Sequence, residues 1–590
     1  ASSLFTWDGA QVQINGITVG RGAGAVSTNT AVGASALAAS TTGSEIVGLG
    51  YQALQANTTG YSLVAVGYTA LKANTTGTNQ VAVGRNALLS STTGSYNTAV
   101  GDQALASNTT ASNNTAIGYQ AAYSNTTGAR NTAHGYQAGY SNSTSDYNTA
   151  TGYQTLFTNT GAYNTAVGAL AMYANTTGTE NIAVGVSALD SNTTGSYNTV
   201  IGTSALQANT TASNNTAVGY QAGYSNQTGA NITAIGIQSG YSFIGSVSES
   251  YGSTFLGRQA GQSTTSGYDN AFVGARAGNN NTTGATNVAV GAAALYSNTT
   301  GYESVAVGYQ ALYGGTIGRN NIAIGYGAMF AANTGDYNVA IGGSALTANT
   351  SGTWNFAGAK NALLANTTGS YNTAIGGSAL QANTTGSRSI AIGYQAGYSN
   401  TTGSINAIGD GALYSNTTGA GNVALGGGNN TALYPSLYAN TTGNYNTAVG
   451  MGSLGQNITA SNLTAVGYQA LYSNTGGANT AVGAQALYSN TSGIYNTAIG
   501  GGVVGSNTGA LGQNTTGQSN TAMGYGALAL NTTASNNTAV GYQAGYSNLT
   551  GVDVAYFGYQ AGYGNTGDRN VAVGRGAMFA TGAGSYNAVL

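Results

Sequence analysis

Side chains that could carry out acid, base or metal chemistry are scarce in this sequence. One histidine, 11 basic and 13 acidic residues are spread over 590 residues, and there is no cysteine. The histidine, His134, stands where equivalent positions carry Val or Ile, and acids near it, such as Asp146, recur at no fixed spacing. Catalytic and metal sites need several such groups held together. We therefore expect no enzyme activity, no cofactor and no metal, and we interpret His134 as an adapted position on the inner face of the fold.

The charge pattern also excludes two classes of partner. The net charge is −2 and the charged residues occur singly, so there is no basic stripe to bind the phosphates of a nucleic acid. No stretch approaches 18 consecutive apolar residues, so we expect no membrane-spanning segment.

Tyrosine is the abundant side chain that could recognise a ligand, because aromatic rings bind sugars well and 42 are present. One set directly follows a recurring glycine, and a second set (Tyr123, Tyr140, Tyr173 and Tyr224) follows it at five residues. The first set consists of Tyr51, Tyr68, Tyr119, Tyr136, Tyr153 and Tyr220. We predict that this set and the single proline, Pro435, are surface recognition residues for a host glycan or protein. The alternative is that the tyrosines stack into stabilising ladders or fill a seam between chains.

Asn-Thr-Thr triplets match the acceptor for N-glycosylation, but they also suit a tight turn, since Asn and Gly tolerate a left-handed backbone. Six of them begin at Asn57, Asn74, Asn108, Asn125, Asn175 and Asn192. We interpret these triplets as structural turns.

These residues recur because the sequence is a repeat with a period of 17. The glycine that closes each apolar tetrapeptide falls at residues 33, 50, 67, 84, 101, 118, 135 and 152, and it continues with few slips through Gly574, giving about 32 units. Three longer intervals mark insertions at 237–256, 427–449 and 501–523. We expect these insertions to bulge from the repeats and to make specific contacts.

A unit this short, rich in Asn, Thr and Gly, cannot form two packed helices. Its apolar half alternates with period two, as in Val64 and Val66 with Ala65 between them, which is typical of a strand. We predict one coil per unit: this strand with the larger side chains inside, a second short strand in segments such as YQALYSN, and an NTTG turn. The fold class is therefore all-β, a parallel β-solenoid spanning residues 27–590, with residues 1–26 as an N-terminal cap or attachment segment.

The predicted coil leaves a second apolar face made of small Ala residues. Such a face favours packing against another copy of the chain, and we expect a homo-oligomer with three-fold symmetry. A monomeric solenoid with a wider coil is the alternative.

The strings TAVGYQAL and VAVGRNAL resemble the head repeats of trimeric autotransporter adhesins, which form trimers of left-handed parallel β-rolls. They are more similar still to the repetitive shafts of bacteriophage tail fibres. The resemblance extends from Gly16 to the end of the sequence, although this chain has the longer repeat unit. It implies a rigid, virion-borne or otherwise surface-exposed fibre whose N-terminus binds an attachment protein. Alternatives are a bacterial surface adhesin, an ice-binding protein that uses Thr ladders, and an extracellular matrix filament.

Overall fold

The computed structural model describes residues 5–7, 11–14, 17–245, 252–428, 434–580 and 582–590. The chain divides into two compact units, residues 1–293 with 298–300 and residues 294–297 with 301–590. Within the described residues every regular element is a short β-strand and there is no helix. The predicted all-β class is confirmed.

The strands of the first unit are β1 Phe5–Trp7, β2 Gln11–Ile14, β3 Ile17–Gly20, β4 Thr30–Val32, β5 Ile46–Leu49, β6 Leu63–Val66, β7 Gln80–Val83, β8 Thr98–Val100, β9 Thr115–Ile117, β10 Thr132–His134, β11 Thr149–Thr151, β12 Thr165–Val167, β13 Ile182–Val184, β14 Thr199–Ile201, β15 Thr216–Val218, β16 Thr233–Ile235, β17 Thr254–Leu256, β18 Ala271–Val273 and β19 Val288–Val290. The strands of the second unit are β20 Val305–Val307, β21 Ile322–Ile324, β22 Val339–Ile341, β23 Phe356–Gly358, β24 Thr373–Ile375, β25 Ile390–Ile392, β26 Ile405–Ile408, β27 Asn422–Leu425, β28 Thr447–Val449, β29 Thr464–Val466, β30 Thr480–Val482, β31 Thr497–Ile499, β32 Thr521–Met523, β33 Thr538–Val540, β34 Ala555–Phe557, β35 Val571–Val573 and β36 Ala588–Val589.

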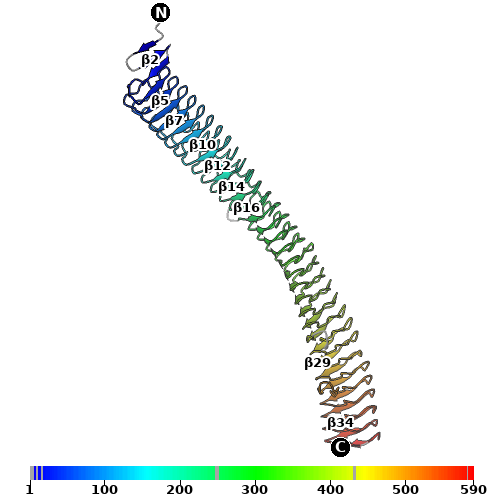
Figure 1. Cartoon of the computed structure of the whole chain (residues 1–590). Helices are drawn as coiled ribbons and strands as arrows, with labels where there is room; N and C mark the ends of the chain where they lie inside the picture. The colour runs from blue at the N-terminus through cyan, green and yellow to red at the C-terminus, as the bar shows by residue number, and fades with distance from the viewer. Residues whose placement is uncertain (1–4, 8–10, 15–16, 246–251, 429–433, 581) are drawn as a thin grey trace. The chain divides into compact units, whose positions relative to one another are not determined.

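Equivalent residues of successive repeats lie directly above one another in each unit (Figure 1). Strand β10 pairs in parallel with β9, and Ala133 lies opposite Ala116. The closing glycines form a column so tight that a Cβ added to Gly101 would lie 2.3 Å from the carbonyl oxygen of Gly118. Each repeat is thus one coil, and the predicted parallel β-solenoid of about 32 turns is confirmed.

The face of the strand that points into the coil is the opposite of the predicted one. On β13 the middle residue, Ala183, is fully buried, whereas Ile182 and Val184 are 43% and 37% exposed. The predicted inner face of Val and Ile and the predicted outer face of Ala were wrong. In most coils the inward position of the strand holds an alanine, and side chains such as Ile182 and Val184 are left outside. Larger residues also occur at the inward position, because Val200 and Phe255 are fully buried there.

The rest of the interior comes from the segment after the glycine. Ala104 and Leu105, three and four residues past Gly101, are fully buried. This segment is not the predicted second strand but a chain of turns, with Gln103 and Leu105 in the left-handed region at φ 60° and 49°. Its backbone bonds the next coil, as Leu105 N donates to Ala121 O at 3.0 Å. These turns fold the chain back sharply, which keeps the coil narrow.

Two columns of buried asparagine complete the interior. The turn residue Asn74 donates from Nδ2 to Oδ1 of Asn57 at 2.8 Å and to Gly77 O at 3.1 Å. In most coils the asparagine before the strand accepts a backbone bond from the next coil, as Asn114 N donates to Asn97 Oδ1 at 2.9 Å. Most buried asparagines therefore find partners in their own and adjacent coils, which favours one stacking register.

The N-terminal strands differ from the repeats because they pair antiparallel. Strand β1 pairs with β2, β2 with β3, and β3 with β4 of the first coil, where Val19 lies opposite Val32. A solenoid end presents an unpaired sheet edge, and β3 occupies that edge. Capping by the segment 1–26 stays a prediction with this geometry in its favour.

The insertions enter the coil at two places. Residues 501–509 replace the two residues that normally follow the glycine, and the coil resumes where Ala510 N donates to Gly500 O at 3.0 Å. The insertion within 427–449 has the same position, because Ser436 N donates to Gly426 O at 3.0 Å, although residues 429–433 lie outside the described part. The insertion within 237–256 falls in the turn region after the buried Phe243, and its residues 246–251 also lie outside the described part.

Candidate functional site

The six predicted recognition tyrosines all lie on the surface of the first unit, with exposed fractions of 40–53%. Tyr119, Tyr136 and Tyr153 stack in one column with ring centroids 5.2–5.3 Å apart, and Tyr51 stacks on Tyr68 at 5.2 Å. The rings face one another at interplanar angles of 11–19°, so ring edges and hydroxyls rather than open ring faces point to solvent. The stabilising ladder considered above is therefore present, and ligand recognition by these residues stays a prediction.

The second tyrosine set forms another ladder, and it is less exposed than the first. Tyr123, Tyr140, Phe157 and Tyr173 stack with centroids 5.0–5.2 Å apart. Offset stacking adds about 0.5–1.5 kcal/mol per pair beyond simple burial, so these ladders stabilise the contacts between coils.

Pro435 does not offer a recognition surface in this chain. It is buried and directly precedes Ser436, where the coil resumes after the insertion. Its neighbour Tyr434 is the exposed residue here, 42% exposed, and its ring lies 5.2 Å from that of Tyr438.

His134 lies outside the coil rather than on its inner face. It is exposed, in the column that contains Ile117 on the preceding coil and Thr151 on the next. Its interpretation as a core position was wrong because the side chains next to the closing glycine point outward. Among the described residues there is no group of three or more His, Cys, Asp or Glu that could hold a metal ion.

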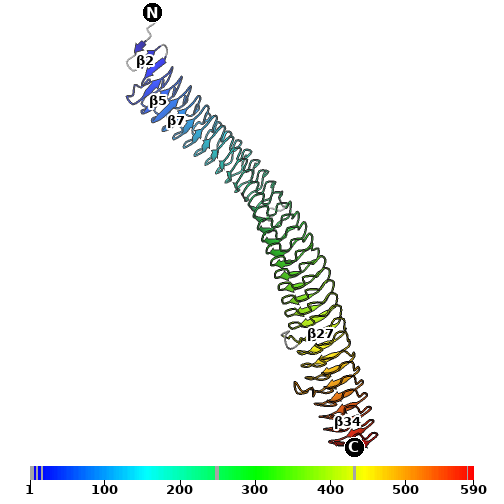
Figure 2. The same ribbon diagram turned by 45° about the vertical axis from the view of Figure 1, so that its right-hand side comes forward.

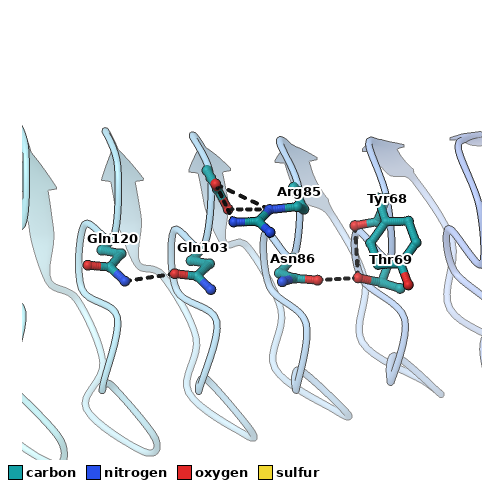
Figure 3. Close-up of polar contacts among 7 residues, drawn as sticks. Tyr68, Thr69, Arg85, Asn86, Gln103 and Gln120 are labelled. Carbon is teal, nitrogen blue, oxygen red and sulfur yellow. Dashed lines mark hydrogen bonds and ion pairs between the residues drawn. The ribbon is translucent and has the colours of Figure 1, made fainter.

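Polar side chains outside the coil bond the equivalent residue one coil away. Gln120 Nε2 donates to Gln103 Oε1 at 2.7 Å, and Thr69 donates to the Asn86 side chain (Figure 3). Arg85 pairs with Asp102 at 2.8 Å, and this hydrogen-bonded carboxylate raises the pKa of Arg85. Both side chains are partly solvated, so the pair contributes little to stability.

The Asn-Thr-Thr triplets are turns in which the asparagine is buried. The first threonine donates its hydroxyl to the next coil, as Thr58 Oγ1 does to Thr75 O at 3.0 Å, while the second, such as Thr59, is exposed. The turn interpretation is confirmed. A glycan on Asn57 would require its fully buried amide to leave the column.

The outward face of the strands is an exposed surface that continues from coil to coil. We call it the outer strip: the side chains one and three residues before each closing glycine. Along β21 to β25 its ten members include Val339, Phe356, Gly358 and Thr373, and the other six are isoleucines that are 36–42% exposed. They are Ile322, Ile324, Ile341, Ile375, Ile390 and Ile392. The outer strip recurs in each described coil, with apolar side chains at both positions in some coils and Thr at the position three before the glycine in many others.

Sequence reasoning missed the outer strip, although a signal for it was present. The position three before the glycine is Thr in many repeats, and the position one before it is His134 or Thr151 in two of them. The middle position instead carries Ala in nearly all repeats and never a charged residue. Tolerance of polar side chains marks the solvent face.

Comparison of the sequence with models of known protein families finds no match, and comparison with curated proteins finds none either. In the described residues no helix is long and apolar enough to cross a membrane.

Proposed function

We propose that the chain is the shaft of a fibre, formed by parallel copies that pack their outer strips together around a common axis. The outer strip carries this proposal. Soluble monomers rarely expose a contiguous apolar patch of more than a few hundred Å², and this strip continues through coil after coil of each unit. A second copy offers the same flat surface with the same spacing between strands, about 4.8 Å.

Three-fold symmetry suits three flat strips that meet edge to edge and enclose an apolar centre. Cyclic assemblies close and so bury every strip without leaving a free one. The copies thereby gain the core that one narrow coil, filled with Ala, Leu and Asn, does not provide.

The biological role that we propose is mechanical. A stack in which each coil bonds the next through backbone, Asn and Tyr columns resists bending, and it can hold a recognition element away from a particle or cell. We propose a virion tail fibre or a surface adhesin, with the N-terminal segment bound to an attachment protein and a host glycan or protein contacted along the exposed tyrosines. The chain's own chemistry supports no reaction as part of this role.

Sedimentation of the whole chain tests the proposal. Ile324→Lys with Ile392→Lys places charges on the outer strip without disturbing the coil, since both side chains already point outward. We expect the native chain to sediment as a trimer and the double variant as a folded monomer with unchanged circular dichroism. Thr368→Lys, at an exposed turn position, is the matched control and should remain a trimer. A native chain that is monomeric at micromolar concentration would contradict the proposal.

A further inference from the structure

A repeated outer strip leaves the axial register of neighbouring copies poorly defined. If one copy slips by a coil, every outward side chain meets an equivalent partner, and only one coil of contact is lost at the end. Register is weakly specified wherever the pairing surface is periodic. A feature that does not repeat with the coil is needed to set the level of one copy against another.

The loop of residues 501–509 is such a feature. It is held in place by Val503 N donating to Thr508 Oγ1 at 3.2 Å, and by Ser506 Oγ donating to Val503 O at 2.7 Å. It rests on the preceding coil, where Gly502 N donates to Ala484 O at 2.9 Å. The orange part of the chain in Figure 2 shows it leaving the side of the stack.

The tip of this loop presents two apolar side chains to solvent. Val503 is 57% and Val504 is 60% exposed, more than any other valine in the described residues. The loop bonds to its own chain through backbone and hydroxyl groups, and more than half of each valine stays exposed to solvent. Adjacent exposed valines on an ordered loop are typical of a contact surface.

An apolar counterpart lies at the other end of the same strand. Tyr495 stands just before β31, on the opposite edge of the outer strip, and is 64% exposed. The loop begins just after β31, so Tyr495 and the loop lie at nearly the same level of the stack. Within one chain strand β31 lies between them.

Parallel copies related by a rotation axis bring these two edges together. Each copy then places one edge of its outer strip, the edge with Tyr495, beside the opposite edge of the next copy's strip, which carries the loop. We propose that Val503 and Val504 pack on Tyr495 of the neighbouring copy and thereby set the axial register of the fibre. This inference rests on the proposed association of outer strips.

Cysteine cross-linking of the whole chain tests the contact, and the absence of native cysteine keeps the experiment free of background. The variant Val503→Cys with Tyr495→Cys places one thiol on the loop and one at the other end of β31, and a disulfide between them requires Cα atoms within about 7 Å. Under mild oxidation we expect it to form covalent closed rings of copies, whose mass on a non-reducing gel gives the number of copies.

Two matched controls move the second cysteine by one coil. Ala478→Cys and Ser519→Cys, each combined with Val503→Cys, stand at the position equivalent to Tyr495 one coil below and one coil above. Because one coil is about 4.8 Å, we expect their cross-linked yield to be at least about tenfold lower. Ile499→Cys, on the outer strip itself, reports whether strips meet at all.

The outcomes separate the two proposals. Val503→Cys is paired with a cysteine at residue 478, 495 or 519. If oligomers cross-link through Ile499→Cys but these three pairs cross-link equally or not at all, the register contact is overturned and the association of outer strips stands. A chain that sediments as a monomer and forms no cross-link at any of these positions would overturn both. Preferential cross-linking of the Val503 and Tyr495 pair supports the contact.

Discussion

A Cβ added to Gly240 would lie 2.6 Å from Cδ2 of Phe255, so the ring of Phe255 occupies the space that a larger residue would fill. Gly240 and Phe255 belong to adjacent coils, and in most coils their equivalents are Leu and Ala, as in Leu105 and Ala116, both fully buried. The interior volume between these two coils is thus shared by the turn of one and the strand of the next, and the large Phe255 accompanies the small Gly240.

This exchange predicts strong coupling between the two positions. Gly240→Leu alone should destabilise its coil by overpacking, and Phe255→Ala alone should do so by about 3–5 kcal/mol through a cavity. The double variant restores the usual Leu and Ala at these two positions and should recover part of the loss, since Gly261, whose added Cβ would lie 2.3 Å from Phe255 Cδ1, still leaves space. Hydrogen exchange measured by mass spectrometry over residues 236–274 reports the effect locally. Additive losses in the double variant would show that the two side chains do not share one space.

Neighbouring residues on β10 should respond in opposite ways to the same substitution. Ala133 is 3% exposed inside the coil, whereas His134 is exposed on the outer strip. Ala133→Lys should disrupt the local coil, because a buried unpaired ammonium group is very costly. His134→Lys should leave the coil folded. Local hydrogen exchange distinguishes the two, and the reverse ranking would contradict the observed strand orientation.

The Asn-Thr-Thr turns predict that replacing their asparagine lowers the stability of the fold, whether or not a glycan is attached. Asn366 Nδ2 donates to Asn349 Oδ1 at 2.9 Å and to Gly369 O at 3.0 Å, whereas Thr368 is exposed. Asn366→Ala should cost about 1–3 kcal/mol, since it leaves buried groups of adjacent residues without partners. Thr368→Ala removes the same acceptor triplet and should be nearly neutral. Equal losses in thermal stability for both variants would argue against the column as the cause, and intact mass of the native chain should show no added sugar.

Tyr556 predicts a loss of stability at alkaline pH. Burial raises the pKa of Tyr556 to about 12, from an ordinary value of about 10. Between these values the unfolded chain releases the phenolic proton and the folded chain keeps it, so stability should fall as pH rises from about 10 to 12. Tyr556→Phe should flatten this part of the melting temperature profile. Tyr495→Phe, at an exposed position, is the control and should keep the slope of the native chain.

The repeat allowed much of the fold to be predicted from sequence. Glycines at a spacing of 17 residues predicted the column that Gly101 and Gly118 form, and the Asn-Thr-Thr triplets predicted turns such as the one at Asn57. Stacked ladders were one of two interpretations of the tyrosines, and the stacking of Tyr119 on Tyr136 shows that such ladders exist. The segment containing Leu105 was misread as a strand, because a left-handed leucine is too rare to be expected from residue type alone.

The sequence by itself determined that one repeat makes one coil and that equivalent residues align, because a fixed period admits a single parallel register between neighbours. Only the tertiary structure decided which side of each strand is inside. Alternation of large and small apolar residues is the same whichever face is buried. The left-handed turns at residues such as Gln103 and Leu105 fold the chain back against the face that carries Ala183, and Ile182 is left on the other face. That choice turns the larger side chains outward and creates the surface on which assembly depends.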